Sequence, residues 1–141
     1  MQHGFARGEC GLTLMELIIV LAVIAIIGAI LAPNFVSATD RTRLKSDIQS
    51  SRIIQTAIET YNAERSSPIS TTDSVATILT TLRNKGYLSN ANGSIPQTDG
   101  AVWVYNGNVV LDITGCGPNI RGDIYRALST EERDVIVGGT P

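Results

Sequence analysis

The side chains that most often carry out covalent or metal chemistry are few in this sequence. Its 141 residues contain one histidine, His3, and two cysteines, Cys10 and Cys116. A zinc site of Cys and His ligands, a Ser-His-Asp triad and a multi-disulfide framework all lack the residues that they need. The net charge is -2, so no basic excess favours nucleic acid as a partner. We therefore expect a protein that is not an enzyme and that uses no metal and no cofactor.

One carboxylate is notable because it lies in an apolar run. Residues 17–32 are all apolar or glycine, and in the preceding residues 12–16 only Thr13 and Glu16 are polar. As a helix, residues 12–32 would be about 31 Å long, which matches the hydrocarbon core of a bilayer. A charge is costly in such a segment, so Glu16 is a candidate functional residue with an expected partner. Alternatively, Glu16 lies at headgroup depth and interacts with its own helix dipole.

The same run has a second interpretation as a secretory signal peptide. Residues 29–32 loosely resemble a small-residue cleavage site. The run is longer than a usual signal core and carries Glu16 in its first turn, and both features argue against removal of the run. An uncleaved signal anchor stays open as an alternative. Cys10 precedes the apolar run, whereas a lipidated cysteine should follow one, so we do not expect lipidation.

The residues at the start of the run form a specific pattern, Gly11-Leu12-Thr13-Leu14-Met15-Glu16. This pattern resembles the class III signal of type IV pilins and type II secretion pseudopilins. In that family a short polar leader ends in glycine, the fifth residue after the cut is glutamate, and the 22nd is proline. Counted from Leu12, these positions are Glu16 and Pro33. Leu12 departs mildly from the family, in which phenylalanine is commoner as the first mature residue.

The resemblance implies a maturation and assembly pathway. A prepilin peptidase would cut between Gly11 and Leu12, Leu12 would be N-methylated, and Glu16 would meet the new amine of a neighbouring subunit. An intrachain pair between the Leu12 amine and Glu16 is the alternative. The implied partners are the membrane, an assembly platform protein, a cytoplasmic ATPase and further copies of the chain. The implied location is the cytoplasmic (inner) membrane for a single-pass precursor and an extracellular filament after assembly. The positive-inside rule does not clearly favour a cytoplasmic N-terminus, so this orientation rests on the resemblance.

Small residues recur along the apolar run at steps of three and four. They would let helices approach closely, which makes Gly28 an assembly candidate together with Glu16 and Pro33. Ordinary membrane-helix composition is the alternative explanation. Pro33 lacks an N–H and follows Gly28 by just over one turn, which predicts a bend or a weakened segment. The stripe consists of Ala22, Ala25, Gly28, Ala29 and Ala32.

After Pro33 the pattern becomes amphipathic. Leu44, Ile48, Ile54, Ile58 and Tyr61 fall near one face, with Ser51 as its weak point. A continuous helix from Leu12 to about Ala63 would be roughly 78 Å long, too long for the remaining residues to cover. Its first half must therefore be buried in lipid or against other copies. The other faces are expected to carry Asp40, Arg41, Arg43, Lys45, Asp47 and Arg52.

The C-terminal part predicts a short helix and a small sheet. The helix covers residues 72–85, is capped by Thr72 or Asp73, and is followed by Gly86. Strands over 101–105 and 108–114 are joined by Asn106-Gly107, a hairpin signal in which both turn residues need positive φ. This hairpin should pack on Ile54, Ile58 and Tyr61. A helix over 120–128, a helical turn from Ser129 and an edge strand over 135–137 complete the prediction.

Three short motifs are weak signals. Arg121-Gly122-Asp123 matches an adhesion tripeptide, and Asn92-Gly93-Ser94 matches a glycosylation triplet. Asn90, Asn92 and Asp99 carry oxygen ligands but lack the spacing of a regular calcium site. The major type II secretion pseudopilins carry a C-terminal calcium loop. That loop is not found in this sequence, which favours a pilin over that pseudopilin.

Together these observations predict an α+β, pilin-like chain. We expect a leader (1–11), a membrane-spanning or filament-core half of the helix (12–33), an amphipathic half (34–64) and a C-terminal globular part (65–141). The expected function is that of a major-type subunit of a type IV pilus-like filament. One alternative is a type II secretion or competence pseudopilin, which serves secretion or DNA uptake. Another is a membrane-anchored binding or enzymatic domain.

Overall fold

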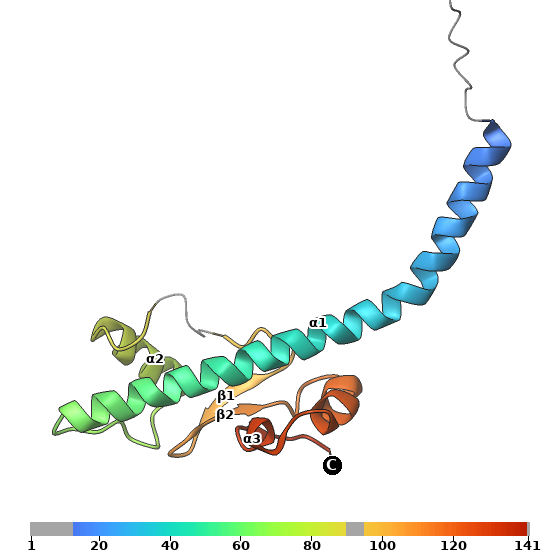
Figure 1. The fold of residues 1–141 in the computed structure, drawn as a ribbon. Coiled ribbons are helices and arrows are strands. Elements are labelled where there is room, and N and C mark those ends of the chain that lie inside the picture. Colours follow the sequence, from blue (N-terminus) through green and yellow to red (C-terminus); the bar gives the residue numbers. More distant parts are fainter. Residues whose placement is uncertain (1–12, 90–94, 141) are drawn as a thin grey trace, which may run out of the picture. The chain divides into compact units, whose positions relative to one another are not determined.

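A computed structural model describes residues 13–89 and 95–140, with Pro33 and Asn34 described as backbone only. It confirms the α+β organisation: a long N-terminal helix precedes a small part with a short helix and a three-stranded sheet (Figure 1). The chain divides into two compact units, Met1–Val36 and Ser37–Pro141. The long helix, α1 (Leu14–Glu64), contributes to both units, and each unit is described by itself.

In the first unit the described residues form the N-terminal part of α1. The helix continues through Pro33, so the proline does not end it. The bend expected there stays a prediction. Gly11 and Leu12 lie outside the described residues, as do Asn90, Asn92 and the rest of the glycosylation triplet.

The second unit confirms the amphipathic face of α1. Leu44, Ile48, Ile54 and Ile58 are buried. Ser51, the weak point of this face, is also buried, and its hydroxyl donates to the Ile48 carbonyl at 2.8 Å. That bond satisfies the hydroxyl without a water molecule.

One residue of the polar faces was predicted wrongly. Asp47 is buried, with a side chain only 1% exposed. Helical periodicity places it on the flank of the apolar face, and backbone groups from a distant loop replace the water that its carboxylate would otherwise need. That loop lies about fifty residues later in the chain, so the sequence around Asp47 could not predict its burial.

The short helix α2 (Val75–Asn84) begins later than predicted. Its N-cap is Ser74, which has an extended backbone and accepts a hydrogen bond from the Thr77 N–H. Thr72 and Asp73, the predicted caps, lie in the preceding turn, where the Asp73 N–H donates to the Ser70 carbonyl. Gly86 follows the helix with φ +81°, as expected for the residue that ends a helix.

The sheet has the order β1-β2-β3. Strands β1 (Val102–Tyr105) and β2 (Val109–Asp112) form the predicted antiparallel hairpin, with Tyr105 paired to Val109. Strand β3 (Ile136–Val137) lies parallel to β2, which confirms the predicted short strand.

The turn of this hairpin differs from the prediction. Gly107 has φ +105°, but no non-glycine residue among those described has positive φ, so Asn106 does not. The Tyr105–Val109 pair leaves three residues in the loop, and a single positive-φ glycine is enough to close it. Inside the loop the Asn106 side chain accepts from the Asn108 N–H at 3.3 Å.

The predicted helix over 120–128 is a short π-helical segment, η1 (Ile120–Ile124), with α-helical residues on either side. Its inward side chains, Ile120 and Ile124, are buried, as is Leu128. The helical turn α3 (Thr130–Arg133) follows, and Ser129 and Glu132 form a reciprocal capping box at its start.

Two hydrophobic clusters hold the second unit together, and Figure 1 shows the hairpin alongside the C-terminal half of α1. One joins Leu44 and Ile48 of α1 to the sheet and to η1. The other joins Ile54 and Ile58 to α2 and Val109, which confirms the predicted packing of the hairpin. Trp103 packs against both clusters.

Candidate functional site

The carboxylate of Glu16 takes part in the start of its own helix. Its Oε2 accepts from the backbone N–H of Thr13 at 3.2 Å and from the Thr13 hydroxyl at 3.4 Å. In return, the Thr13 hydroxyl oxygen accepts from the Glu16 backbone N–H at 3.2 Å. This reciprocal arrangement is a capping box, which satisfies two backbone donors at the helix N-terminus. The Thr-x-x-Glu spacing was visible in the sequence, and the capping role was missed there.

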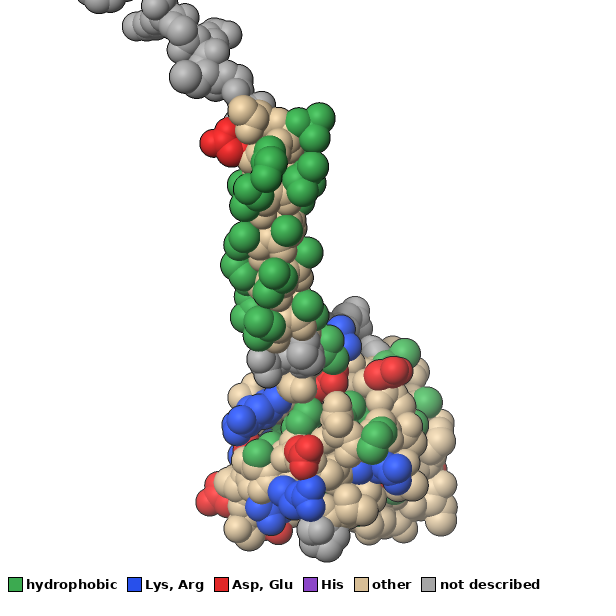
Figure 2. Space-filling model, turned by 90° about the vertical axis from the view of Figure 1, so that its right-hand side faces the viewer, with side chains coloured by type: hydrophobic (Ala, Val, Ile, Leu, Met, Phe, Trp, Pro, Cys, Tyr) green, Lys and Arg blue, Asp and Glu red, His purple; other side chains and the backbone are tan. Residues whose placement is uncertain are grey.

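Apart from Glu16, the described surface of α1 as far as Val36 is apolar and exposed. Every described side chain from Leu14 to Val36 is exposed in this chain, including Met15 (72%) and Phe35 (76%). Figure 2 shows hydrophobic side chains covering the visible face of this segment. Among the described residues α1 is the one helix long and apolar enough to cross a membrane. So large an apolar surface needs a bilayer or a protein partner.

Gly28 lies in the middle of this surface with open space around it. A methyl group in place of its hydrogen would meet no atom within 4 Å. A glycine lowers the stability of an α-helix by about 1 kcal/mol relative to alanine. Packing within the chain does not explain why this position has a glycine. Gly28 is twelve residues from Glu16, or about 18 Å along the helix, so the structure does not bring the two together. They share only the exposed apolar segment.

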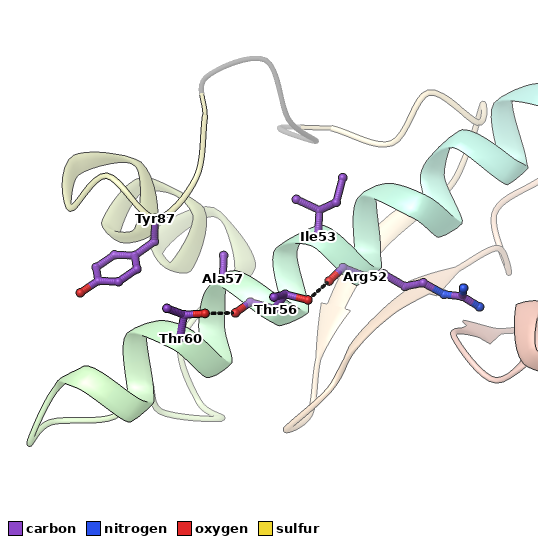
Figure 3. A pocket seen from close by; sticks show the side chains of 6 residues that line it. All are labelled: Arg52, Ile53, Thr56, Ala57, Thr60 and Tyr87. Atoms are coloured by element: carbon purple, nitrogen blue, oxygen red, sulfur yellow. Dashed lines mark hydrogen bonds between the residues drawn. The ribbon is translucent and has the colours of Figure 1, made fainter.

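A shallow hollow of about 380 Å³ lies beside the C-terminal half of α1 (Figure 3). The hydroxyls of Thr56 and Thr60 donate to the carbonyls of Arg52 and Thr56, at 3.0 and 2.8 Å. These hydroxyls are thus satisfied by the helix itself, and no carboxylate lines the hollow. Its lining consists of Arg52, Ile53, Thr56, Ala57, Thr60 and Tyr87.

The buried Asp47 binds the loop before the sheet. Its two carboxylate oxygens accept from the backbone N–H groups of Gln97 at 2.8 Å and Thr98 at 2.7 Å. Gln55 makes a second link, because its side-chain oxygen accepts from the Val109 N–H at 2.9 Å. Both residues fix α1 to segments about fifty residues later in the chain, which is an architectural role.

The Arg121-Gly122-Asp123 triplet lies in the π-helical segment. The Asp123 carboxylate pairs with Arg126 at 2.8 Å, and the Arg121 carbonyl accepts from the N–H and hydroxyl of Thr140. The triplet is therefore held in a helical turn and tied to its neighbours. This geometry argues against an extended adhesion loop.

Cys116 is buried. Burial raises the pKa of its thiol, and the nearby Asp99 carboxylate raises it further. A thiol with a raised pKa is a poor nucleophile, which fits a packing role. Within residues 13–89 and 95–140, no group of three or more His, Cys, Asp or Glu residues is placed to hold a metal ion.

Comparison with known proteins gives one informative similarity. The chain is 32% identical over 93 residues to a protein named prepilin peptidase-dependent protein A from Clostridium perfringens (strain 13 / Type A). The alignment covers 66% of this chain and 58% of that relative, so the chain spans little more than half of the relative's length. No protein-family model and no solved structure matches the chain.

Proposed function

We propose that this chain is the precursor of a filament subunit of the type IV pilin kind, with a structural and not a catalytic role. In this proposal a prepilin peptidase removes residues 1–11 and Leu12 is N-methylated. The mature subunit is held in the membrane by the apolar part of α1, and a platform protein and a cytoplasmic ATPase move it into a helical array.

The observation that carries the proposal is the exposed apolar segment of α1, which consists of residues 14–32 with Phe35 and Val36. A lipid bilayer can cover this surface in the precursor, and sister helices can cover it in a filament. Two further observations support the same conclusion. The Gly11–Glu16 pattern precedes the segment, and the similar Clostridium protein is named for its dependence on prepilin peptidase.

Glu16 has two roles in this proposal, and they can be separated. Its carboxylate caps the helix together with Thr13, and in the filament its charge pairs with the Leu12 amine of a neighbouring copy. An unpaired carboxylate is costly in an apolar environment, so this pairing would select one axial register.

The first experiment measures the intact mass and the N-terminal sequence of the protein purified from its own cells. We expect the loss of residues 1–11 and the gain of one methyl group at Leu12. An uncut N-terminus in cells that contain an active prepilin peptidase would contradict the proposal.

The second experiment compares Glu16→Gln with Thr13→Ala in filament yield. Glutamine can still complete the capping box but has no charge, whereas Thr13→Ala removes the cap and keeps the carboxylate. We expect Glu16→Gln to be cut normally but to assemble poorly, and Thr13→Ala to assemble nearly as well as wild type. Equal filament yields for Glu16→Gln and wild type would remove the intersubunit role of Glu16.

A further inference from the structure

Two arginines at the start of the second unit have side chains with no partner among the described residues. Both residues are exposed, and neither the Arg41 nor the Arg43 side chain forms an ion pair or a hydrogen bond with any residue in the described part of the chain. The neighbouring Asp40 pairs with neither of them. Both cations are thus available to an external anion.

Several cations farther along the chain are engaged internally. Lys45 pairs with Glu132 at 3.1 Å, and Arg52 donates to the Glu131 carbonyl at 3.1 Å. Arg126 pairs with Asp123, and Arg133 donates to the carbonyls of Arg126 and Leu128. The lack of partners at Arg41 and Arg43 is therefore not a general property of this surface.

Each of these arginines lines its own hollow. Arg41 borders a hollow of about 340 Å³ against the η1 segment, together with the Asn119 amide and Asp123. Asp123 is already paired with Arg126, so it does not neutralise Arg41. Arg43 borders a hollow of about 620 Å³ against the loop over residues 95–101, in which Asp99 is the acidic residue.

The distance of these arginines from the apolar segment indicates what they meet. Arg41 and Arg43 follow Val36, the last residue of the bare apolar surface, by five and seven residues. At 1.5 Å per residue this is about 8 and 11 Å of helix. The headgroup layer is about 5–8 Å thick on each side of the hydrocarbon core. The two arginines therefore lie at or just beyond its outer edge, and their long side chains can extend back toward it.

We propose that Arg41 and Arg43 bind the phosphate groups of anionic lipids and thereby fix the depth of the membrane-held subunit. Guanidinium groups match phosphate oxygens in bidentate geometry, and the two hollows leave room for headgroups beside the helix. This inference rests on the membrane-held state in the proposed function, but it does not depend on cleavage or on filament assembly.

The test uses the full chain in nanodiscs that contain phosphatidylcholine and phosphatidylglycerol. Native mass spectrometry then measures how strongly each lipid is retained by the protein. We expect wild type to prefer phosphatidylglycerol, and Arg41→Gln and Arg43→Gln each to lower this preference roughly fivefold. Lys85→Gln is the matched control, because Lys85 is an exposed cation at the end of α2 and far from Val36 in sequence. It should leave the preference unchanged.

An unchanged preference in the Arg41→Gln/Arg43→Gln double variant would overturn the inference, and so would an equal loss in Lys85→Gln. Millimolar inorganic phosphate should not displace the lipid, and displacement would assign the arginines to free phosphate instead. Trp103 fluorescence confirms that each variant is folded. Leader cleavage, measured separately on wild type in its own cells, tests the proposed function. An uncut chain that still retains phosphatidylglycerol through these arginines would contradict the proposed function but not the lipid inference.

Discussion

The Asp47 carboxylate accepts the Thr98 backbone N–H at 2.7 Å across 51 residues of sequence, and its second oxygen accepts the Gln97 N–H. Two backbone donors of a loop are thus satisfied by one buried side chain of α1. A side chain that accepts two such bonds holds the loop before the sheet against the helix.

Asp47→Asn should lower the free energy of unfolding by about 1–3 kcal/mol. Asparagine has one carbonyl oxygen, and its amide hydrogens would face an N–H donor, so one of the two backbone donors loses its partner. Denaturant unfolding of the full chain in mild detergent, followed by the fluorescence of Trp103, measures the change. The exposed Asp73→Asn is the control and should leave the midpoint unchanged, whereas equal midpoints for both variants would contradict the role of Asp47.

Gly100→Ala should be more destabilising than Gly86→Ala, although both glycines have φ +81°. At Gly86 a methyl group meets open space, so only the left-handed backbone is penalised, by about 1–2 kcal/mol. At Gly100 the methyl carbon would lie 2.4 Å from the Gly115 carbonyl oxygen. We expect this overlap to cost at least about 1 kcal/mol more. The same unfolding measurement compares the two variants, and equal losses would show that the backbone contact relaxes freely.

Gly28→Ala should leave the isolated subunit folded and normally cut, because nothing lies within 4 Å of the added methyl group. If sister helices approach each other at Gly28, the same change should lower filament yield, and Gly28→Leu should lower it further. Ile27→Leu, which keeps the side-chain volume, serves as the control. Filament yield from sheared cells is the measurement, and normal yield from Gly28→Leu would exclude a close helix contact at this residue.

Stability should fall in acid partly through Glu132. The Ser129 backbone N–H, with a smaller effect from Lys45, lowers the pKa of the Glu132 carboxyl below its usual range. A carboxyl with a lowered folded-state pKa contributes stability above its unfolded pKa of about 4.3 and loses it as pH falls through the folded value. Denaturant midpoints at pH 7 and pH 4 should therefore differ less in Glu132→Gln than in wild type. An unchanged difference would assign the acid sensitivity to other groups, such as Asp112, whose pKa is lowered by the Thr114 hydroxyl and N–H.

Local signals in the sequence predicted most of the elements. Periodicity at Leu44, Ile48, Ile54 and Ile58 gave the buried face of α1, and Asn106-Gly107 gave the position of the hairpin turn. These features depend on neighbours within a few residues, which a local pattern contains.

Features that depend on residues far apart in the chain were harder to predict from the sequence. The burial of Asp47 depends on N–H groups fifty residues away, and the turn geometry depends on the register that pairs Tyr105 with Val109. For the candidate site, the apolar segment and Glu16 were found from composition and spacing. The Thr13–Glu16 capping box was present as a four-residue pattern and was overlooked. Only the structure shows that the Arg41 and Arg43 side chains have no partner within residues 13–89 and 95–140.

The parallel pairing of β3 with β2 has a consequence for biogenesis. The N–H groups of Leu111 and Ile113 donate to the carbonyls of Val135 and Val137. The pairing of β2 is therefore incomplete until residues 135–137 have been synthesised. In the proposed function, the ribosome exposes the apolar segment of α1 to the membrane insertion machinery before it has synthesised those residues. Membrane insertion in that proposal precedes completion of the sheet, so a chain truncated before Val135 would be held in the bilayer with the edge of β2 unpaired and open to proteases.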